Sequence, residues 1–588
     1  MGRFIVGLFA VIGFLVVLLI GMGAAGIWVW VSRPDAAYEN RWIALTVDFR
    51  QTLSEGPGAG PLAQILGDEA MTLRDTVRAI DKAAADPEVE LLVAHFGGDA
   101  FGMAAAQEIR DAVTRFRAAG KPAVAYADAF GEFGPGNISY YAATAFDTIW
   151  LREVGGVGLT GIAAEVPFAR EGLDDLGFDA QFARRGIYKS FPESLTESGF
   201  TPPHREMIES LTGDLQAQLV AGIAEGRDRP VASVRDLIDR GPFTAREALE
   251  AGLIDGLASG EALAEEIFDR HGVSLTTPRV SLSDYARWPV EIPEDAPTIA
   301  LIEAEGLIVE GEGATDPLLG LAVMGADTIA RAIDGAAASP AVEAIVLRID
   351  SGGGSAVASD IIGQAIRRAG ENGKPVVVSM GNAAASGGYW VAAPADLIIA
   401  QPATLTGSIG VFAGKIVTEE FWESWGVNWE AVPQAQNALM WSSGRRYSPS
   451  EVERLNAFLD ATYAAFIERV ATGRDLDPTA VEAIAGGRVW TGAQALELGL
   501  VDRLGGLNEA FAAARELIDA EPDVPLEVRV MPEPPSLLDR LLSLVGGFAG
   551  SGANGAFDRL RPLVQRLEPL LFDPSAHVAR MPPILIGG

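Results

Sequence analysis

Short apolar runs alternate with amphipathic helical patterns along most of the chain. Strand-like runs at 43–45 and 91–94 flank a helix-like stretch, and runs at 299–301 and 344–349 repeat this arrangement about 250 residues later. Short apolar strands separated by helical patterns are typical of βαβ units around a largely parallel sheet. The pattern therefore predicts an α/β fold that is present in two successive copies.

The two copies are related by a direct echo in sequence. The segment VRAIDKAAADP at 77–87 matches ARAIDGAAASP at 330–340. Further matches follow at near-constant spacing: Lys121 with Lys374, Tyr140 with Tyr389, Asp147 with Asp396, Gly177 with Gly426, and 248–249 with 495–496. Helical stretches at about 201–226 and 449–472 close each unit. A period of this length indicates domain duplication rather than a solenoid of short repeats.

The chain of 588 residues is too long for one hydrophobic core. We predict a signal anchor at 1–33, an N-terminal repeat at 40–272, a proline-rich linker at 273–297, a C-terminal repeat at 298–530 and a leucine-rich tail at 531–588. The leucines of the tail have helical spacing. We expect this tail to pack on the protein's own body, with a membrane-proximal or oligomer contact as the alternative.

The anchor is predicted from an uncharged run between Phe4 and Val31, which Arg3 precedes. The run is longer than the apolar region of a secretory signal peptide, and it exceeds the roughly 20 residues that span a bilayer. Trp28 and Trp30 are typical of a membrane interface. We therefore expect one uncleaved transmembrane helix, with everything after about residue 33 on one side of the membrane.

Composition excludes several classes of function. The formal net charge of −34 argues against nucleic acid or an anionic membrane surface as the main partner. The chain has no cysteine, which excludes a thiol nucleophile, thiolate metal sites and disulfides. The four histidines are scattered without the spacing of metal ligands. We predict no metal and no cofactor.

Two glycine-rich turns are the candidate reactive region. Ser386 lies in AASGG at 384–388, between a predicted strand at 376–380 and a helical pattern at 389–393. Such a turn can expose a serine hydroxyl and direct the next backbone N–H at a developing oxyanion. The turn SGGG at 351–354 ends the neighbouring strand, and parallel neighbours would place both turns at one sheet edge. It can supply a second oxyanion N–H, with anion binding as the alternative.

A serine nucleophile needs a base, and the use of lysine narrows the search. Only five of the 45 basic residues are lysines: Lys82, Lys121, Lys189, Lys374 and Lys415. Lys121 and Lys374 are equivalent positions that lead into strands, Lys82 lies on a helical face, and nothing distinguishes Lys415. Lys189, in GIYKS at 186–190, fits a role that arginine cannot perform. Burial in an apolar cleft can lower the pKa of a lysine enough for it to accept a serine proton.

The duplication divides this pair between the repeats. At an offset of 249, Asn137 lies opposite Ser386, and Ala438 lies opposite Lys189. One repeat has thus kept a nucleophile and the other a base. A contact between an N-terminal and a C-terminal unit is therefore expected to be a precondition for activity, whether within one chain or between protomers. Separated repeats should be inert.

Three motifs resemble the signal peptide peptidase A family, also called protease IV. They are YKS at 188–190, AASGGYW at 384–390 and LTGSIGV at 405–411, and the similarity extends over about 40–530 and the anchor. The resemblance implies tandem Clp/crotonase-like βαβ-superhelix domains preceded by one transmembrane helix. It also implies roles for individual residues: Ser386 as nucleophile, Lys189 as general base, the N–H groups of Gly353 and Gly387 as oxyanion hole, and Ser408 as a candidate for orienting the lysine.

The same resemblance implies a homotetramer in the bacterial inner membrane with its catalytic body in the periplasm. Its substrates would be hydrophobic signal-peptide remnants, which could add as strands beside an exposed sheet edge. Two positions depart from the family pattern. Gly352 replaces the usual proline and suggests a more flexible oxyanion loop, whereas Phe191 replaces an alanine and suggests a reshaped pocket beside the base.

The leading hypothesis is a membrane-anchored serine endopeptidase with a Ser386/Lys189 dyad. One alternative is a catalytically weak scaffold or binding protein with the same fold, which predicts no labelling of Ser386 by a serine-directed probe. A second alternative is a crotonase-like enzyme acting on acyl-CoA thioesters. The anchor argues against the second, because coenzyme A is a cytoplasmic metabolite.

Overall fold

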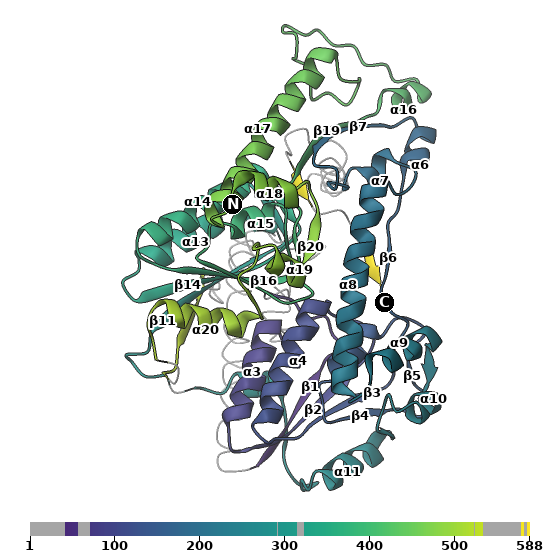
Figure 1. Cartoon of the computed structure of the whole chain (residues 1–588), viewed down its shortest axis with the longest axis vertical. Coiled ribbons are helices and arrows are strands. Elements are labelled where there is room, and N and C mark those ends of the chain that lie inside the picture. The colour runs from purple at the N-terminus through teal and green to yellow at the C-terminus, as the bar shows by residue number, and fades with distance from the viewer. Residues whose placement is uncertain are drawn as a thin grey trace, which may run out of the picture.

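The computed structural model describes residues 42–56, 71–290, 292–313, 323–521 and 524–532, and two short strands at 578–580 and 585–587. Two α/β units are stacked along the long axis, the N-terminal unit in purple to blue and the C-terminal unit in teal to green (Figure 1). The predicted anchor and most of the predicted tail lie outside the described residues. Within the described part of the chain, no helix is both long and apolar enough to cross a membrane.

The N-terminal repeat is built on a six-stranded parallel sheet with the order β10-β1-β2-β3-β4-β9. Its strands are β1 (Ile43–Asp48), β2 (Val89–Phe96), β3 (Ala123–Ala127), β4 (Thr148–Leu151), β9 (Gly256–Leu257) and β10 (Arg279–Ser281). Its helices are α3 (Leu73–Ala85), α4 (Met103–Ala118), α5 (Asn137–Ala143), α8 (Pro202–Gly226), α9 (Val231–Arg240), α10 (Ala245–Glu250) and α11 (Gly260–Arg270). The predicted βαβ alternation is thus present in this repeat.

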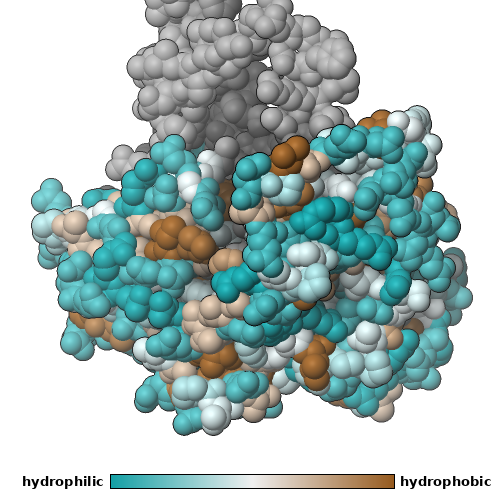
Figure 2. Space-filling model, turned by 90° about the horizontal axis from the view of Figure 1, so that it is seen from above, coloured by the Kyte–Doolittle hydropathy of each residue, from teal (hydrophilic) through white to brown (hydrophobic). Residues whose placement is uncertain are grey.

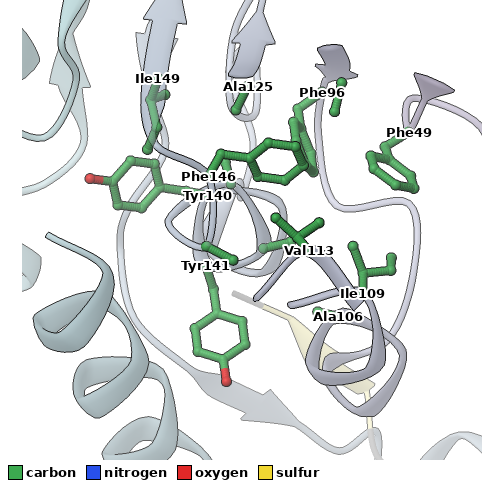
Figure 3. Packing of buried hydrophobic residues seen from close by; sticks show 14 of the residues in the cluster. Phe49, Phe96, Ala106, Ile109, Val113, Ala125, Tyr140, Tyr141, Phe146 and Ile149 are labelled. Carbon is green, nitrogen blue, oxygen red and sulfur yellow. The ribbon is translucent and has the colours of Figure 1, made fainter. Parts of the chain in front are cut away.

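Aromatic side chains fill the space between this sheet and its helices. Phe96 and Phe146 meet edge to face with ring centroids 5.5 Å apart, and Ile109 and Val113 approach them from α4 (Figure 3). The hydroxyl of the fully buried Tyr140 donates to the carbonyl of Leu253 at 2.6 Å. This packing fixes the turn before α5, which is the counterpart of the Ser386 turn.

The C-terminal repeat has the same plan around an eight-stranded sheet with the order β20-β18-β16-β14-β11-β22, in which β17 pairs with β16 and β21 with β17. Its strands are β11 (Thr298–Glu305), β14 (Val342–Ser351), β16 (Val376–Ala385), β17 (Leu397–Ala400), β18 (Leu405–Gly407), β20 (Val489–Thr491), β21 (Arg503–Leu504) and β22 (Glu527–Met531). Its helices are α13 (Ala326–Ala338), α14 (Ala356–Glu371), α15 (Gly387–Ala392), α17 (Pro449–Gly473), α18 (Pro478–Ile484), α19 (Gly492–Glu497) and α20 (Leu507–Leu517).

Part of the predicted linker belongs to the N-terminal repeat. β10 adds to the edge of that sheet beside β1, and α12 (Leu282–Ala286) follows it. Leu282 and Tyr285 are buried in the core, and the Tyr285 hydroxyl donates to Asp86 at 2.8 Å. β10 therefore completes the sheet of the first repeat at its edge beside β1, as β22 completes the sheet of the second by pairing with β11.

A third sheet joins the repeats, with the order β13-β12-β15-β23-β19-β7. Its strands are β13 (Val323–Gly325), β12 (Leu307–Val309), β15 (Gly353–Ser355), β23 (Val578–Arg580), β19 (Val411–Val417) and β7 (Asp179–Arg185). β7 comes from the N-terminal repeat and runs antiparallel to β19 of the C-terminal repeat, from Arg185 opposite Val411 to Asp179 opposite Val417. The segment that leads to Lys189 is thereby fixed to the other repeat.

The remaining short elements lie around this third sheet and the ends of the main sheets. They are β5 (Gly156–Val157) paired with β8 (Phe243–Thr244), β6 (Ala163–Glu165) paired with β24 (Leu585–Gly587), and the helices α6 (Arg170–Asp175), α7 (Glu193–Thr196) and α16 (Glu419–Ser424). Seen from above, the surface is mostly polar, with apolar side chains in separate patches (Figure 2).

The repeats are also joined by a long helix and by a buried ion cluster. The first half of α8 packs on Val489 of the C-terminal repeat, and its second half packs in the core of the N-terminal repeat. Arg348 on β14 lies 2.7 Å from a carboxylate oxygen of Glu55 and 2.6 Å from one of Glu108, both from the other repeat. All three side chains are buried. The two repeats therefore share an interior rather than a surface contact.

Candidate active site

Ser386 occupies the turn between β16 and α15. Its backbone φ of 57° and ψ of −115° are unusual for a residue with a side chain, and such strain is typically retained at functional sites. The β14–β16 register pairs Ser351 with Ala384, so both glycine-rich turns lie at the same sheet edge, as the sequence predicted. The N–H of Gly387 belongs to the first turn of α15, where an N–H has no partner within the helix.

Lys189 reaches the serine from the other repeat of the same chain. Its Nζ lies 2.6 Å from Ser386 Oγ and 3.0 Å from both the Oγ and the carbonyl oxygen of Ser408. Lys189, Ser386 and Ser408 have no exposed surface. Because burial disfavours the charged ammonium, the pKa of Lys189 is well below its usual value.

The other four lysines have structural contacts. Each donates to backbone carbonyls: Lys82 to Tyr285 and Trp288, Lys121 to Ala83 and Asp86, Lys374 to Val342, and Lys415 to Met440 and Ser442. Burial, with the nearby charge of Arg445, lowers the pKa of Lys415 to about 8. Lys415 is thus a second buried lysine, but its Nζ packs 4.1 Å from the centroid of the Tyr447 ring.

A buried polar network, which the sequence reasoning missed, holds the backbone of Lys189. Arg184 donates to the carbonyl of Lys189 at 3.1 Å and pairs with Glu193. The carboxylate of Glu193 also lies 3.0 Å from His204 Nδ1 and accepts from Thr201 Oγ1 at 2.9 Å. Burial alone would raise the pKa of Glu193, but hydrogen bonds from His204, Arg184 and Thr201 hold it below its usual value. The lysine is therefore positioned at both ends, by this network at its peptide and by the oxygens of Ser408 at its amine.

The two predicted oxyanion glycines lie in contact, but the N–H of Gly353 has a partner. A Cβ on Gly387 would lie 3.0 Å from the nitrogen of Gly354 and 3.3 Å from the Cα of Gly353, so only a glycine fits between the turns. Gly353 has φ 110°, and its N–H donates to Ser351 Oγ at 3.1 Å. Ser351 Oγ donates in turn to the carbonyl of Gly306 at 2.6 Å. One of the two predicted donors is thus engaged within the loop.

Ser408 also has a left-handed backbone, with φ 53°, directly after β18. Its N–H donates to the carbonyl of Arg488 at 2.7 Å, and this bond fixes the turn that presents both of its oxygens to Lys189. Phe191 stacks on Phe412 of β19 with ring centroids 4.9 Å apart. The aromatic residue beside the base therefore extends the contact between β7 and β19. The predicted flexibility of the Gly352 loop stays a prediction.

The equivalent position in the N-terminal repeat has a structural role. Asn137 is fully buried, and its Oδ1 accepts the backbone N–H groups of Thr160 at 2.8 Å and Gly161 at 2.9 Å. An amide with these bonds supplies no nucleophile. The pair of Ser386 and Lys189 thus occurs once in the described chain, with one group from each repeat.

A serine hydroxyl beside a buried amine is suited to acyl transfer. A neutral lysine can take the hydroxyl proton, and the oxygen can then attack a carbonyl carbon. A backbone N–H beside the serine, such as that of Gly387, can stabilise the negative charge that develops on a carbonyl oxygen in such a reaction.

Comparison with known proteins gives consistent matches. The model for "Peptidase family S49" matches residues 115–274 and 368–521, one range in each repeat. Protease 4 of Salmonella typhi is 32% identical over 527 residues, which cover 86% of this chain and 82% of the relative. Protease 4 of Haemophilus influenzae is 31% identical over 472 residues, or 77% and 74% of the two chains.

One similar solved structure is a lysine-to-alanine mutant of the 1510-N membrane-bound stomatin-specific protease in complex with a substrate peptide. It has 20% sequence identity, covers 43% of this chain and 98% of its own, and has a TM-score of 0.25.

Proposed function

The chain belongs to peptidase family S49 and is a serine protease, and we propose that Ser386 and Lys189 are its catalytic pair. The observation that carries this proposal is the 2.6 Å distance between Lys189 Nζ and Ser386 Oγ, both of which are buried. Burial favours the neutral amine, which is the form that can act as a base. No carboxylate lies within ion-pair distance of Lys189 in the described residues, so nothing there restores its charge.

In the proposed reaction, Lys189 removes the proton from Ser386 as the oxygen attacks the scissile carbonyl. The lysine then returns this proton to the leaving amine, and an acyl-enzyme remains on Ser386. Water attacks the acyl-enzyme with Lys189 again as base. The two oxygens of Ser408 accept hydrogen bonds from the ammonium that forms transiently. They orient the amine and lower the cost of its charge.

We further propose that the N–H groups of Gly387 and Gly353 form the oxyanion hole. The Gly353 N–H donates to Ser351 Oγ in the structure, so a bound carbonyl would have to replace or share this partner. The exchange is local, because Ser351 Oγ keeps its bond to the carbonyl of Gly306. Binding of a substrate carbonyl would then complete the hole.

The cellular setting that we propose is the one that the family resemblance implies. An anchor at 1–33 would hold the protease in the bacterial inner membrane, with its body in the periplasm as a homotetramer. Hydrophobic signal-peptide remnants would be its substrates. Support comes from the uncharged run between Phe4 and Val31 and from the match to proteases named protease 4 over both repeats. A chain that starts at residue 40 should leave the membrane fraction, whereas the full chain should remain in it.

The catalytic pair is tested by labelling with a serine-directed phosphonate and by hydrolysis of an apolar fluorogenic peptide. Ser386→Ala and Lys189→Ala should lose both signals, with at least about a 100-fold loss of kcat for removal of the base. Lys415→Met is the matched control. It removes another buried lysine of the chain and should keep both signals. Full activity in Lys189→Ala would show that the base is wrongly assigned. Absence of labelling in the unmodified protein would favour a scaffold.

A further inference from the structure

A short loop of the C-terminal repeat contacts both the proposed base and the turn that orients it. The loop consists of residues 486–488 and lies between α18 and β20 (Figure 1). The carbonyl of Gly486 accepts the N–H of Tyr188 at 2.9 Å, and the carbonyl of Arg488 accepts the N–H of Ser408 at 2.7 Å. This loop, named the 486–488 bridge, therefore connects the residue before the base with the residue that holds its amine.

The middle residue of the bridge leaves no room for a side chain. A Cβ on Gly487 would lie 2.5 Å from the backbone nitrogen of Lys189 and 2.6 Å from its Cβ, about 1 Å closer than an ordinary contact. Gly487 also has φ 81°, a conformation that favours glycine. Its N–H donates to the carbonyl of Ile409 at 2.8 Å. The backbone of the lysine thus lies directly against the bridge.

The turn that the bridge holds also holds the nucleophile. The N–H of Ser386 donates to the carbonyl of Gly407 at 2.8 Å, and Gly407 pairs with Val489, the first residue of β20. The base comes from the N-terminal repeat, whereas this turn belongs to the C-terminal repeat. The bridge therefore fixes the base relative to the backbone that carries the nucleophile.

The side chain of Arg488 adds a second connection to the residue next to the base. Its guanidinium carbon lies 4.8 Å from the centroid of the Tyr188 ring and 4.5 Å from that of the Trp490 ring. Arg488 also pairs with Glu206 at 2.7 Å, and Glu206 accepts from the hydroxyl of Tyr188 at 2.8 Å. The bridge is thus attached to Tyr188 by its backbone and by a side chain.

The two glycines of the bridge are specific to one repeat. At the spacing that relates 248–249 to 495–496, residues 239–240 correspond to 486–487, and they are an aspartate and an arginine. Helix α9 continues through 239–240, whereas α18 ends at Ile484, before the bridge. The glycine pair is therefore found in the repeat whose loop contacts the catalytic lysine.

We propose that Gly487 is a positioning residue, through which the 486–488 bridge sets the distance between Lys189 Nζ and the hydroxyl of Ser386. The proposal rests on the proposed function, because it assumes that Lys189 is the base. A side chain at position 487 would displace the lysine by about 1 Å, or would displace the bridge together with the turn of Ser408. A misplacement of about 1 Å can cost about 100-fold in rate. The loss should affect kcat rather than KM.

The test compares Gly487→Ala with Gly499→Ala, both in the full chain. Gly499 also has a left-handed backbone, with φ 71°, but among the described residues a Cβ there would meet only Leu476, at 4.0 Å. The backbone strain is thus matched, and the contact with the lysine is not. Gly487→Ala should lower kcat on the apolar fluorogenic peptide about 100-fold and change KM by less than about twofold. Gly499→Ala should keep both values.

A second readout follows the serine without a bound peptide. The rate at which the serine-directed phosphonate labels Ser386 should fall with kcat in Gly487→Ala, because labelling depends on the activated hydroxyl. Arg488→Ala keeps the carbonyl of the bridge and removes only its side-chain contacts, so it should lower kcat and the labelling rate about tenfold. Arg469→Ala is its control, because it breaks a half-buried pair with Asp360 in the same repeat and should leave both rates unchanged.

Several results would overturn the proposal and leave the catalytic assignment intact. One is an equal kcat in Gly487→Ala and Gly499→Ala, with both variants folded by circular dichroism. Another is a raised KM with unchanged kcat and labelling rate, which would mean that the bridge shapes the peptide groove instead. If Gly487→Ala does not fold, equal labelling rates in Arg488→Ala and Arg469→Ala would overturn it. Full activity in Lys189→Ala would refute the proposed function itself.

Discussion

Replacing Arg348 with methionine should lower the free energy of unfolding, because the Arg348 side chain is a cation buried between the two repeats. Its guanidinium lies 2.7 and 2.9 Å from the two oxygens of Glu55 and 2.6 Å from Glu108. The three side chains are at most 7% exposed. Methionine fills a similar volume but leaves two buried carboxylates without a cation, although the N–H of Leu507 still donates to Glu108. Breaking a buried ion pair in this way costs about 3–5 kcal/mol.

The loss should depend on pH in a defined direction. Burial raises the pKa of Glu108, and the charge of Arg348 opposes this rise. In the variant the opposition is gone, so the pKa of Glu108 in the folded state lies further above its unfolded value. A raised folded pKa means that stability is lost as pH rises through it. Arg348→Met should therefore be closest to the unmodified protein at acidic pH and furthest from it at neutral pH.

Thermal unfolding is a suitable assay, with matched variants as controls. For folded units of about 150–250 residues, 1 kcal/mol corresponds to about 2–4 °C in Tm, so Arg348→Met should lower Tm by at least about 6 °C. Arg368→Met breaks a half-exposed pair with Asp334 in the same repeat and should cost less than about 1 kcal/mol. Adding Glu55→Gln and Glu108→Gln to Arg348→Met removes the unpaired charges and should recover most of the loss. Equal shifts for Arg348→Met and Arg368→Met, or no recovery in the triple variant, would refute the reasoning.

Three further predictions concern the proposed catalytic groups. Because burial lowers the pKa of Lys189 and only the neutral amine is a base, kcat/KM should rise with pH through that pKa and then level off, whereas Lys189→Arg should be inactive at every pH. Because the pKa of Lys189 is lowered, the folded state binds fewer protons than the unfolded state. Lys189→Met should therefore raise Tm more at acidic than at alkaline pH. An equal rise at both would contradict a neutral lysine. Gly387→Ala places a Cβ 2.6 Å from Ser359 Oγ and 3.0 Å from the Gly354 nitrogen, and it should lower kcat by about 10²–10³-fold with the fold intact by circular dichroism. Addition of Ser359→Ala should not restore kcat, because the contact with the Gly354 backbone remains.

Local patterns predicted the main elements closely. The helical stretches expected at 201–226 and 449–472 are α8 and α17, at Pro202–Gly226 and Pro449–Gly473. The strand, turn and helix around Ser386 were also predicted, although β16 continues to Ala385. These elements depend on the period of apolar residues and on small residues at turns, which a sequence displays directly.

Long-range pairing was beyond such patterns. The seven residues of β7 are all half-buried and do not alternate, so nothing in them identifies β19 as the partner. β23 and β24 are three residues each and flank a proline pair, and a strand of that length has no readable period. The short β10 and α12 within the predicted linker were not expected for a related reason. The prolines around them indicate a connection rather than a strand or helix.

The candidate site was predicted from chemistry rather than from pattern. Lys189 stood out because the chain otherwise prefers arginine, and its amine lies beside the hydroxyl of Ser386. Glu193 and His204 were missed, because charged residues on helical segments are usually solvated, and only the tertiary fold buries them. The signal that could have found them is the pair of opposite charges, Arg184 and Glu193, that flanks Lys189 in the sequence. The direction of the Gly353 N–H depends on a glycine φ of 110°, which no sequence specifies.

The buried Asn137 has a consequence for how this protein can evolve. Its side chain holds the N–H groups of Thr160 and Gly161, so a mutation to serine would orphan these amides before it gained any reactivity. Position 438, opposite Lys189, would also need a lysine in place of alanine. A second reactive pair would therefore need both substitutions, and the first alone would cost stability without adding reactivity. The two repeats are thus no longer interchangeable, because the packing of the N-terminal repeat itself opposes a second reactive centre.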